Sequence, residues 1–335
     1  MRSASRRLID QARHRAIHER TLPLLENAAH TANEYAWRGS AFPDERLEML
    51  FACAHPAIDP AIRTPLILRT VLGIDAGRIA SAFCVSPAAM RQRFVRATMK
   101  IRDAGIAFEV PEISRLHERV RVVLDAIYAA FGLSWEEGSA DGGSDLNRET
   151  VWLARVVAKL LPQEREAQAL LALVLFVEAR RSSRRVGGVY VPLDEQNPQS
   201  WTRTMLGEAE DALLRSRSDR PERFAIEATI QAQHVARRHG TPVDWLEVLR
   251  LYDELAAFGA LGALVSRAAV HARVFGAPAA LAQLESLDAK WVVVYQPYWA
   301  LRAHLTGNRV DYDRAIALAQ DEPTRAFLAK KRDAR

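Results

Sequence analysis

The sequence predicts an all-α protein, in which a short group of helices near the N-terminus precedes a longer series of amphipathic helices. Apolar residues recur every three or four positions along most of the chain, which is the helical period. Its 335 residues suggest about two domains, and 49% hydrophobic with 26% charged residues is typical of a globular chain. Proline and glycine stand between the periodic stretches, where helices are expected to end.

Two helices are expected before residue 75. Asp44 is placed to cap a helix that ends at Ala54, and Asp59 followed by Pro60 is a typical start for the second. Pro65 falls inside the second pattern and is expected to bend it.

The stretch from Asp75 to Lys100 predicts a helix-turn-helix. Asp75 is expected to cap a helix through Phe83, residues 84–86 to form the turn, and Ser86 to start a second helix. Four apolar residues of the second helix are spaced by 4, 3 and 4, so they share one inward face. They are Met90, Phe94, Ala97 and Ile101.

The rest of the second helix is basic, with no acidic residue before Asp103. An amphipathic helix with a solvated charged face is the plain alternative, but such faces usually mix both signs. Residues 1–105 hold 16 Lys and Arg against 10 Asp and Glu, and the remainder holds 30 against 31. This distribution favours nucleic-acid contact by the first third of the chain. The candidate DNA-binding residues are Ser86, Arg91, Gln92, Arg93, Arg96 and Lys100.

The run DERLEMLFACAHPAIDPAIRTPLILRTVLGIDAGRIASAFCVSPAAMRQRFVRATMKIRDAGIAFEVP resembles region four of bacterial extracytoplasmic-function RNA polymerase sigma factors. The resemblance is to the subgroup with a long helical C-terminal extension, and it covers nearly the whole chain. It continues through FGLSWEEGSADGGSDLNRET, LLPQEREAQALLALVLFVEARRSS, VPLDEQNPQSW and DRAIALAQDEPTRAFLAKK. It implies that the second helix reads the minus-35 promoter element, with promoter DNA and core RNA polymerase as partners.

The sequence departs from that family at several positions. Arg78 stands where the family usually has glutamate, Thr98 and Met99 where it often has basic residues, and Cys84 where many helix-turn-helix turns have glycine. A left-handed Cys84 would cost roughly 1 kcal/mol. RRLIDQARHR matches only the last helix of region two, so we expect weak duplex binding without promoter opening. A start site placed too late and a truncated or diverged relative both account for this.

The resemblance and the helical pattern together predict three parts. Residues 1–43 are the remnant of region two with a linker, 44–110 the helix-turn-helix domain, and 111–335 a tetratricopeptide-like extension without a clean 34-residue period. Residues 116, 120, 123, 127 and 131 form the extension's first apolar stripe. Its later helices are expected at 146–160, 164–180, 199–215, 222–238, 243–257, 262–275, 278–287, 293–306, 310–319 and 322–332.

Two loops interrupt these helices, at 138–147 and 180–201. The second is long, with a short hairpin expected at Gly187-Gly188, and long ordered loops are often functional. Its Asp194 and Glu195 are adjacent in a segment expected to be extended, where neighbouring side chains point to opposite sides. That argues against a shared acid–base site. Six tryptophans, at 135, 152, 201, 245, 291 and 299, are expected in the core, with a ligand cleft as the alternative.

No enzyme chemistry, cofactor or metal site is predicted. The two cysteines, Cys53 and Cys84, form no CxxC pair, and His55 near Cys53 is expected at a helix end or in the core. No run of 18 apolar residues and no apolar leader occurs, so we expect a cytoplasmic protein without membrane contact.

The predicted function is a sigma factor whose extension is a built-in regulator that binds a protein or small molecule. One rival is a helix-turn-helix regulator acting without polymerase, another is an interaction scaffold, and a third is a hydrolase using loop 180–201.

Overall fold

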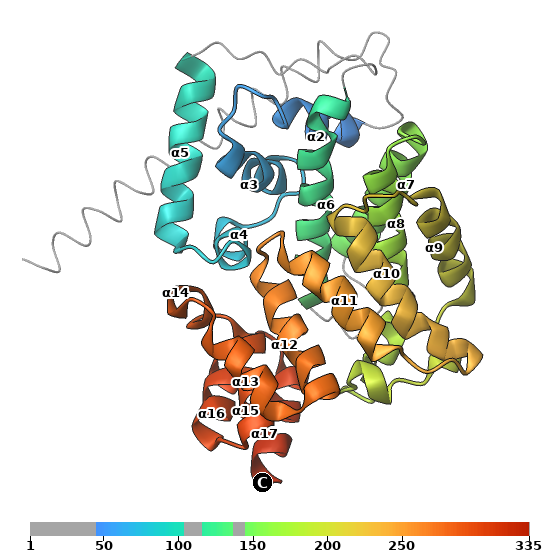
Figure 1. Ribbon diagram of the computed structural model, residues 1–335. Coiled ribbons are helices and arrows are strands. Elements are labelled where there is room, and N and C mark those ends of the chain that lie inside the picture. Colours follow the sequence, from blue (N-terminus) through green and yellow to red (C-terminus); the bar gives the residue numbers. More distant parts are fainter. Residues whose placement is uncertain (1–44, 104–115, 137–144, 335) are drawn as a thin grey trace, which may run out of the picture. The chain divides into compact units, whose positions relative to one another are not determined.

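The computed structural model describes residues 45–103, 116–136 and 145–334, and these residues are mostly helical (Figure 1). This confirms the all-α class. The chain divides into two compact units, Met1–Ala130 and Phe131–Arg335. The expected region-two remnant and linker at 1–43, the boundary at residue 111 and most of loop 138–147 lie outside the described residues. No described helix has the length and apolar character needed to cross a membrane.

The described residues of the first unit form four complete helices and the beginning of a fifth. They are α2 Glu45–Cys53, α3 Pro60–Thr70, α4 Ala76–Ala82, α5 Pro87–Asp103 and α6 His117–Glu136. The Asp59 side chain caps α3 by accepting from the Ala61 amide at 3.0 Å, and Pro65 lies inside that helix, both as the sequence predicted. The core includes Leu47, Leu50, Phe51, Leu66, Ile67, Ile79 and Met90.

The apolar stripe predicted for α6 is confirmed, because all five of its residues are buried. Near the start of this helix the Arg119 guanidinium donates to the Phe51 carbonyl at 3.0 Å, which joins α6 to α2 within the first unit. The Arg119 side chain is itself buried. Carbonyls in the last turn of a helix generally need partners from outside it, and Arg119 supplies one to Phe51.

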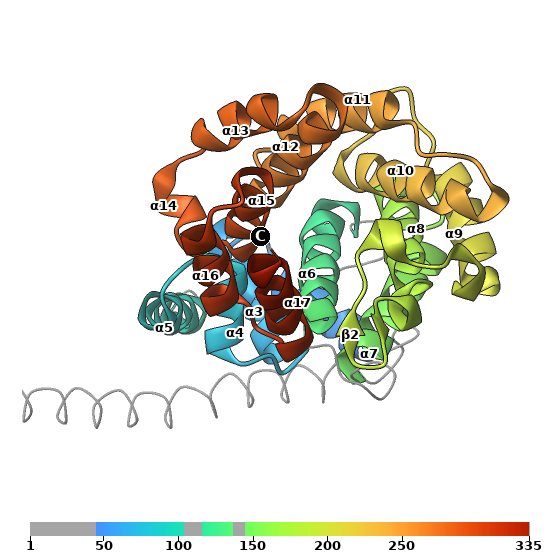
Figure 2. The same ribbon diagram turned by 90° about the horizontal axis from the view of Figure 1, so that it is seen from below.

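The second unit contains α7 Asp145–Leu160, α8 Arg165–Glu178, α9 Arg203–Arg215, α10 Arg223–Val235, α11 Trp245–Ala256, α12 Leu261–Phe275, α13 Ala277–Glu285, α14 Ala289–Val292, α15 Gln296–Thr306, α16 Arg309–Leu318 and α17 Glu322–Asp333. The ten helices predicted after residue 145 are confirmed, with ends that differ by a few residues. The sequence did not predict α14, which is a single turn. Consecutive helices pack on one another along the curved path visible in Figure 2.

Helix α8 is the most buried helix of the second unit, with every residue from Ala167 to Phe176 buried. It packs against α7, α9 and α10, so its central turns have no solvent face, as expected for a stretch that is apolar nearly all round. Glu166 at its start accepts from the amides of Phe224 and Ala225 at 3.0 and 3.2 Å and thereby caps α10. The Glu166 side chain of α8 therefore fixes the beginning of α10.

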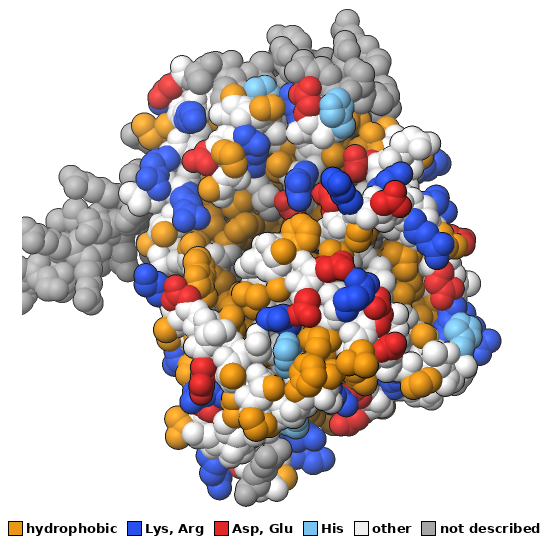
Figure 3. Space-filling view, in the orientation of Figure 1, with side chains coloured by type: hydrophobic (Ala, Val, Ile, Leu, Met, Phe, Trp, Pro, Cys, Tyr) orange, Lys and Arg blue, Asp and Glu red, His pale blue; other side chains and the backbone are white. Residues whose placement is uncertain are grey.

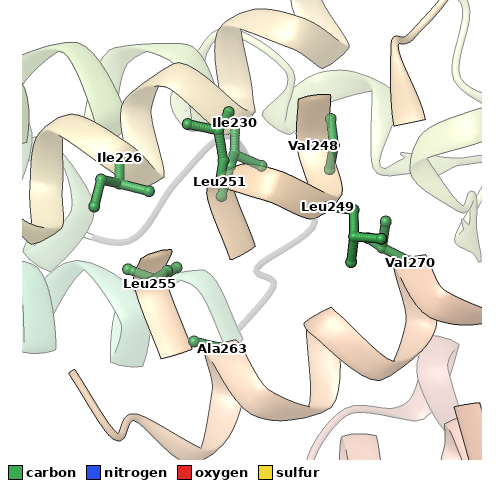
Figure 4. Packing of buried hydrophobic residues seen from close by; sticks show 8 residues of the cluster. All are labelled: Ile226, Ile230, Val248, Leu249, Leu251, Leu255, Ala263 and Val270. Atoms are coloured by element: carbon green, nitrogen blue, oxygen red, sulfur yellow. The ribbon is translucent and has the colours of Figure 1, made fainter. Parts of the chain in front are cut away.

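Helices α10, α11 and α12 share one apolar cluster (Figure 4). It consists of Ile226, Ile230, Val248, Leu249, Leu251, Leu255, Ala263 and Val270. Most of these residues recur at helical intervals of three, four or seven positions: 226 and 230, then 248, 251 and 255, then 263 and 270. This spacing is why the sequence pattern located the helices correctly. Further clusters join α12 to α15 and α15 to α17.

Segment 180–201 contains the only strands among the described residues. They are β1 Arg185–Val186 and β2 Val189–Tyr190, which pair antiparallel with Val186 opposite Val189. Gly187 and Gly188 between them have φ of 59° and 78°, the left-handed values of a two-residue hairpin turn that glycine allows. The predicted hairpin is thus confirmed.

Candidate functional site

Helix α4 and helix α5 are joined by a tight turn whose hydrogen bonds fix their geometry. The Asp75 carboxylate caps α4 by accepting from the Gly77 amide at 2.6 Å. At the other end the Cys84 amide donates to the Ser81 carbonyl and the Val85 amide to the Ala80 carbonyl, at 3.0 and 2.9 Å. This pair of bonds is the Schellman motif.

Cys84 occupies the left-handed position of that motif, with φ of 51°, where glycine is usual. It is the only described non-glycine residue with positive φ. The sequence predicted a cost if Cys84 were left-handed, and it is, so the residue carries a backbone strain of about 1 kcal/mol. The thiol is half-buried, and this burial raises its pKa.

Helix α5 begins where the sequence predicted. The Ser86 hydroxyl accepts from the Ala89 amide at 3.1 Å, which is an N-cap bond, and Pro87 is the first residue of the helix. Met90, Phe94, Ala97 and Ile101 are all buried. The predicted inward face of α5 is therefore correct.

The candidate residues lie outside that face. Ser86, Arg91, Gln92, Arg96 and Lys100 are exposed, and Arg93 is half-buried. The side chains of the four basic residues form no ion pair within the described part of the chain. Figure 3 shows Lys and Arg side chains along the length of α5.

Thr98 and Met99, the two departures from the sigma-factor pattern on α5, have different surroundings. Thr98 is buried, and its hydroxyl donates to the Phe94 carbonyl at 3.0 Å. Met99 is 48% exposed. A basic residue could reach solvent only at position 99, so only that departure removes a charge from the surface.

Cys53 and His55 have structural roles at the end of α2. Cys53 is buried beside the Thr70 hydroxyl at 3.6 Å, and this burial raises the pKa of its thiol to about 11. The His55 imidazole Nδ1 accepts from the Ala57 amide at 3.1 Å, which confirms the predicted helix-end role. No three or more His, Cys, Asp or Glu side chains of the described residues are placed to hold a metal ion.

Segment 180–201 is tied to the last helix of the second unit. The Tyr190 ring on β2 stacks edge-on with Phe327 of α17, with centroids 5.2 Å apart. Arg185 on β1 forms a 3.0 Å ion pair with Asp321, the residue that caps α17. The hairpin thus joins residues about 135 positions apart in the sequence.

The expectation of an extended segment at Asp194 and Glu195 is wrong. Leu193–Glu195 is a 3₁₀ turn, in which the Glu195 amide donates to the Pro192 carbonyl at 2.9 Å. The Asp194 carboxylate pairs with Arg273 of α12. The Asn197 side chain caps the next turn, Pro198–Ser200.

Arginines gather between segment 180–201 and the end of α10. The buried Arg180 donates to the Phe176 carbonyl at 3.1 Å and to the Gln231 side chain. Arg237 donates to three backbone carbonyls, those of residues 193, 194 and 196, at 2.8 to 3.2 Å. His234 of α10 is also buried. The sequence did not single out Arg180, Arg237 or His234 as candidate functional residues. The RRSSRR run was a visible signal for the first, but nothing local marked the other two.

The expectation that all six tryptophans lie in the core is wrong for two of them. Trp201 is 3% exposed and fits the expectation, whereas Trp152 is 37% and Trp291 52% exposed. Trp135 is half-buried, with the Arg181 and Arg184 guanidiniums 4.7 and 4.9 Å from its ring centre. The helical spacing of apolar residues does not tell a surface tryptophan from a core one, because the indole ring has an apolar body and a polar N–H and can occupy either place.

Residues 119–217, which include α7, α8 and segment 180–201, match the family described as "Family of unknown function (DUF6596)". The chain is 34% identical over 344 aligned positions to the uncharacterized protein R00370 of Rhizobium meliloti (strain 1021), and the match covers 97% of this chain and 80% of the relative. The chain belongs to the same family as that protein. No solved structure matches it.

Proposed function

We propose that this protein is a sigma factor of the extracytoplasmic-function type, in which α4 and α5 form a helix-turn-helix that reads the minus-35 promoter element. The observation that carries the proposal is the outward face of α5. It presents Arg91, Arg93, Arg96 and Lys100 without an acidic partner among the described residues, opposite a face locked into the core. A groove-reading helix needs this combination of a fixed side and a free basic side.

The positions along α5 divide the expected contacts. In a helix-turn-helix the first turns of the second helix reach base edges, so Gln92 and Arg93 are assigned to the bases. Arg96 and Lys100 lie further along and are assigned to phosphates. The Ser86 hydroxyl uses its lone pair for the Ala89 amide, which leaves its O–H free to donate to a phosphate oxygen.

The second unit is proposed to be a built-in regulator with a tetratricopeptide-like arrangement, and core RNA polymerase to be the partner of the whole chain. The resemblance to the sigma-factor subgroup with a helical extension supports this assignment. So does the succession of packed helices from α7 to α17, which is the arrangement of helical-repeat proteins.

Fluorescence anisotropy with duplex DNA selected by the chain from a random pool tests the DNA contact. We expect Arg93→Ala to lose about 1–3 kcal/mol of DNA-binding free energy and to discriminate less between sequences. We expect Arg96→Ala to bind all sequences more weakly and to lower the slope of log affinity against log salt concentration by about 1. Arg250→Ala is the control, because Arg250 lies on α11 and is paired with Glu247 and Glu254. Unchanged DNA binding in both α5 variants would show that this helix does not contact the DNA.

A helix-turn-helix regulator that does not use polymerase would show the same DNA result. Co-purification separates the two functions. Retention of core RNA polymerase by the immobilised full chain supports the sigma factor, whereas DNA binding without polymerase retention favours the independent regulator.

A further inference from the structure

The second unit contains a group of buried polar side chains for which the proposed DNA contact has no use. We name it the Arg180 cluster and define it as Arg180, Gln196, Trp201, His234 and Arg237. Four of these side chains are at least nine-tenths buried, with 7%, 7%, 3% and 8% exposure for Arg180, Gln196, Trp201 and His234. They come from three segments: the end of α8, segment 180–201 and the end of α10 with the 3₁₀ turn Ala236–His239.

Positive charge in the cluster is not balanced by carboxylates. Three nearby arginines have an acidic partner: Arg181 has Glu178, Arg238 has Glu210 and Arg273 has Asp194. Within the described part of the chain, Arg180 and Arg237 instead hydrogen-bond only to backbone carbonyls and the Gln231 side-chain oxygen. A buried cation without a counter-charge is costly, so this arrangement needs an explanation.

The electrostatics of the neighbouring groups agree with this excess. Burial, followed by repulsion from Arg237, lowers the pKa of Arg180 to about 10, so its guanidinium still carries its charge at neutral pH. Burial and the same two arginines lower the pKa of His234 to about 4, so its imidazole is neutral there. Among the described residues, the charges that shift these two pKa values come from Arg180 and Arg237, with Tyr190 acting in the opposite direction on Arg180.

Three polar atoms of the cluster are buried without a hydrogen-bond partner among the described residues. They are Trp201 Nε1, Gln196 Oε1 and His234 Nδ1. The Gln196 amide is oriented unambiguously, because its Nε2 donates to the Val191 carbonyl at 3.1 Å. The Trp201 ring centre lies 5.8 Å from the Arg237 Cζ, and the backbone carbonyl of Gln196 accepts a hydrogen bond from the same guanidinium. Buried polar atoms are almost always paired in folded proteins.

We propose that the Arg180 cluster binds a small oxyanion that carries a hydrogen, with hydrogen phosphate as the chemical type. The guanidiniums of Arg180 and Arg237 supply the charge, and the indole N–H of Trp201 is a further donor to an anionic oxygen. Gln196 Oε1 is an acceptor, so the ligand must also donate. Hydrogen phosphate does both, whereas sulfate and chloride have no hydrogen to donate. The inference does not rest on the proposed DNA-binding function.

Thermal unfolding of the full chain at pH 7 tests this, with inorganic phosphate, sulfate or chloride as the probe at matched ionic strength. Phosphate and sulfate both stabilise proteins in general by exclusion from the surface, and that effect grows steadily with concentration. Binding at a site instead saturates. We therefore expect phosphate to raise the Tm by several degrees with a saturating curve and sulfate to show only the steady rise. Equal, non-saturating curves for the two anions would overturn the proposal.

Two variants and one control locate the site. Trp201→Phe removes the indole N–H together with part of the buried ring, so its Tm in chloride should fall by the cost of the cavity. Measured against that new baseline, its phosphate midpoint should weaken about tenfold, as expected for one hydrogen bond to a charged group. Arg180→Met should abolish the saturating response. Trp291→Phe on the exposed turn α14 should keep the parent's response. A full phosphate response in a folded Trp201→Phe protein would contradict the assigned geometry.

Discussion

Replacing Phe94 with alanine should destabilise the first unit, so that the basic surface of α5 is lost at a lower temperature than in the parent. The Phe94 ring is 8% exposed and shares the inward face of α5 with the fully buried Met90 and with Ile101. A buried Phe→Ala change costs about 3–5 kcal/mol, from lost burial and the cavity left behind. That is a large share of the stability of a small domain. For a unit of this size we expect the Tm to fall by about 12 °C or more.

Circular dichroism during urea or thermal unfolding measures this change, and the first unit can give its own transition because the chain has two compact units. Met99→Ala is the matched control on the same helix, since Met99 is 48% exposed and should change stability by no more than about 0.5 kcal/mol. DNA binding should be lost above the lowered Tm and retained below it. A Phe94→Ala transition that coincides with the parent's would mean that the ring is exposed and that α5 is turned differently.

Three further predictions concern the turn, the buried histidine and the second unit. Cys84→Gly should raise stability by about 1 kcal/mol in the same unfolding experiment, since glycine relieves the left-handed strain; a loss of stability would contradict that strain. His234 has a folded pKa of about 4 against 6.5 when unfolded, so only the unfolded state gains a proton between these values and stability should fall by up to about 3 kcal/mol as the pH drops from 6.5 to 4. His234→Gln should flatten this dependence, whereas the exposed His239→Gln should keep it. A fragment of residues 112–335, which holds the second unit and the whole of α6, should unfold cooperatively with a helical spectrum, because the helices of the second unit share their own apolar clusters. A disordered fragment would show that the two parts need one core.

The sequence determined the features that depend on neighbours a few positions apart. The inward face of α5 followed from four apolar residues at helical spacing, and its start from Ser86 and Pro87, because an N-cap and a fixed φ act locally. The hairpin at Gly187-Gly188 followed in the same way from two residues that tolerate positive φ. The exposure of the candidate DNA-binding residues on α5 was also predictable, because residues outside the buried face of a helix point toward solvent.

Tertiary structure alone decided which residues from distant segments meet. Arg180 and Arg237 are 57 positions apart, and Arg185 and Asp321 are 136 apart, so no local pattern could pair them. Periodicity tells which side of a helix is buried, but it carries no information about the helix that covers that side. For this reason the sequence located α8 and α10 correctly without revealing the charged cluster between them. The same limit explains Trp291, whose exposure depends on where α14 lies and not on its neighbours in the chain.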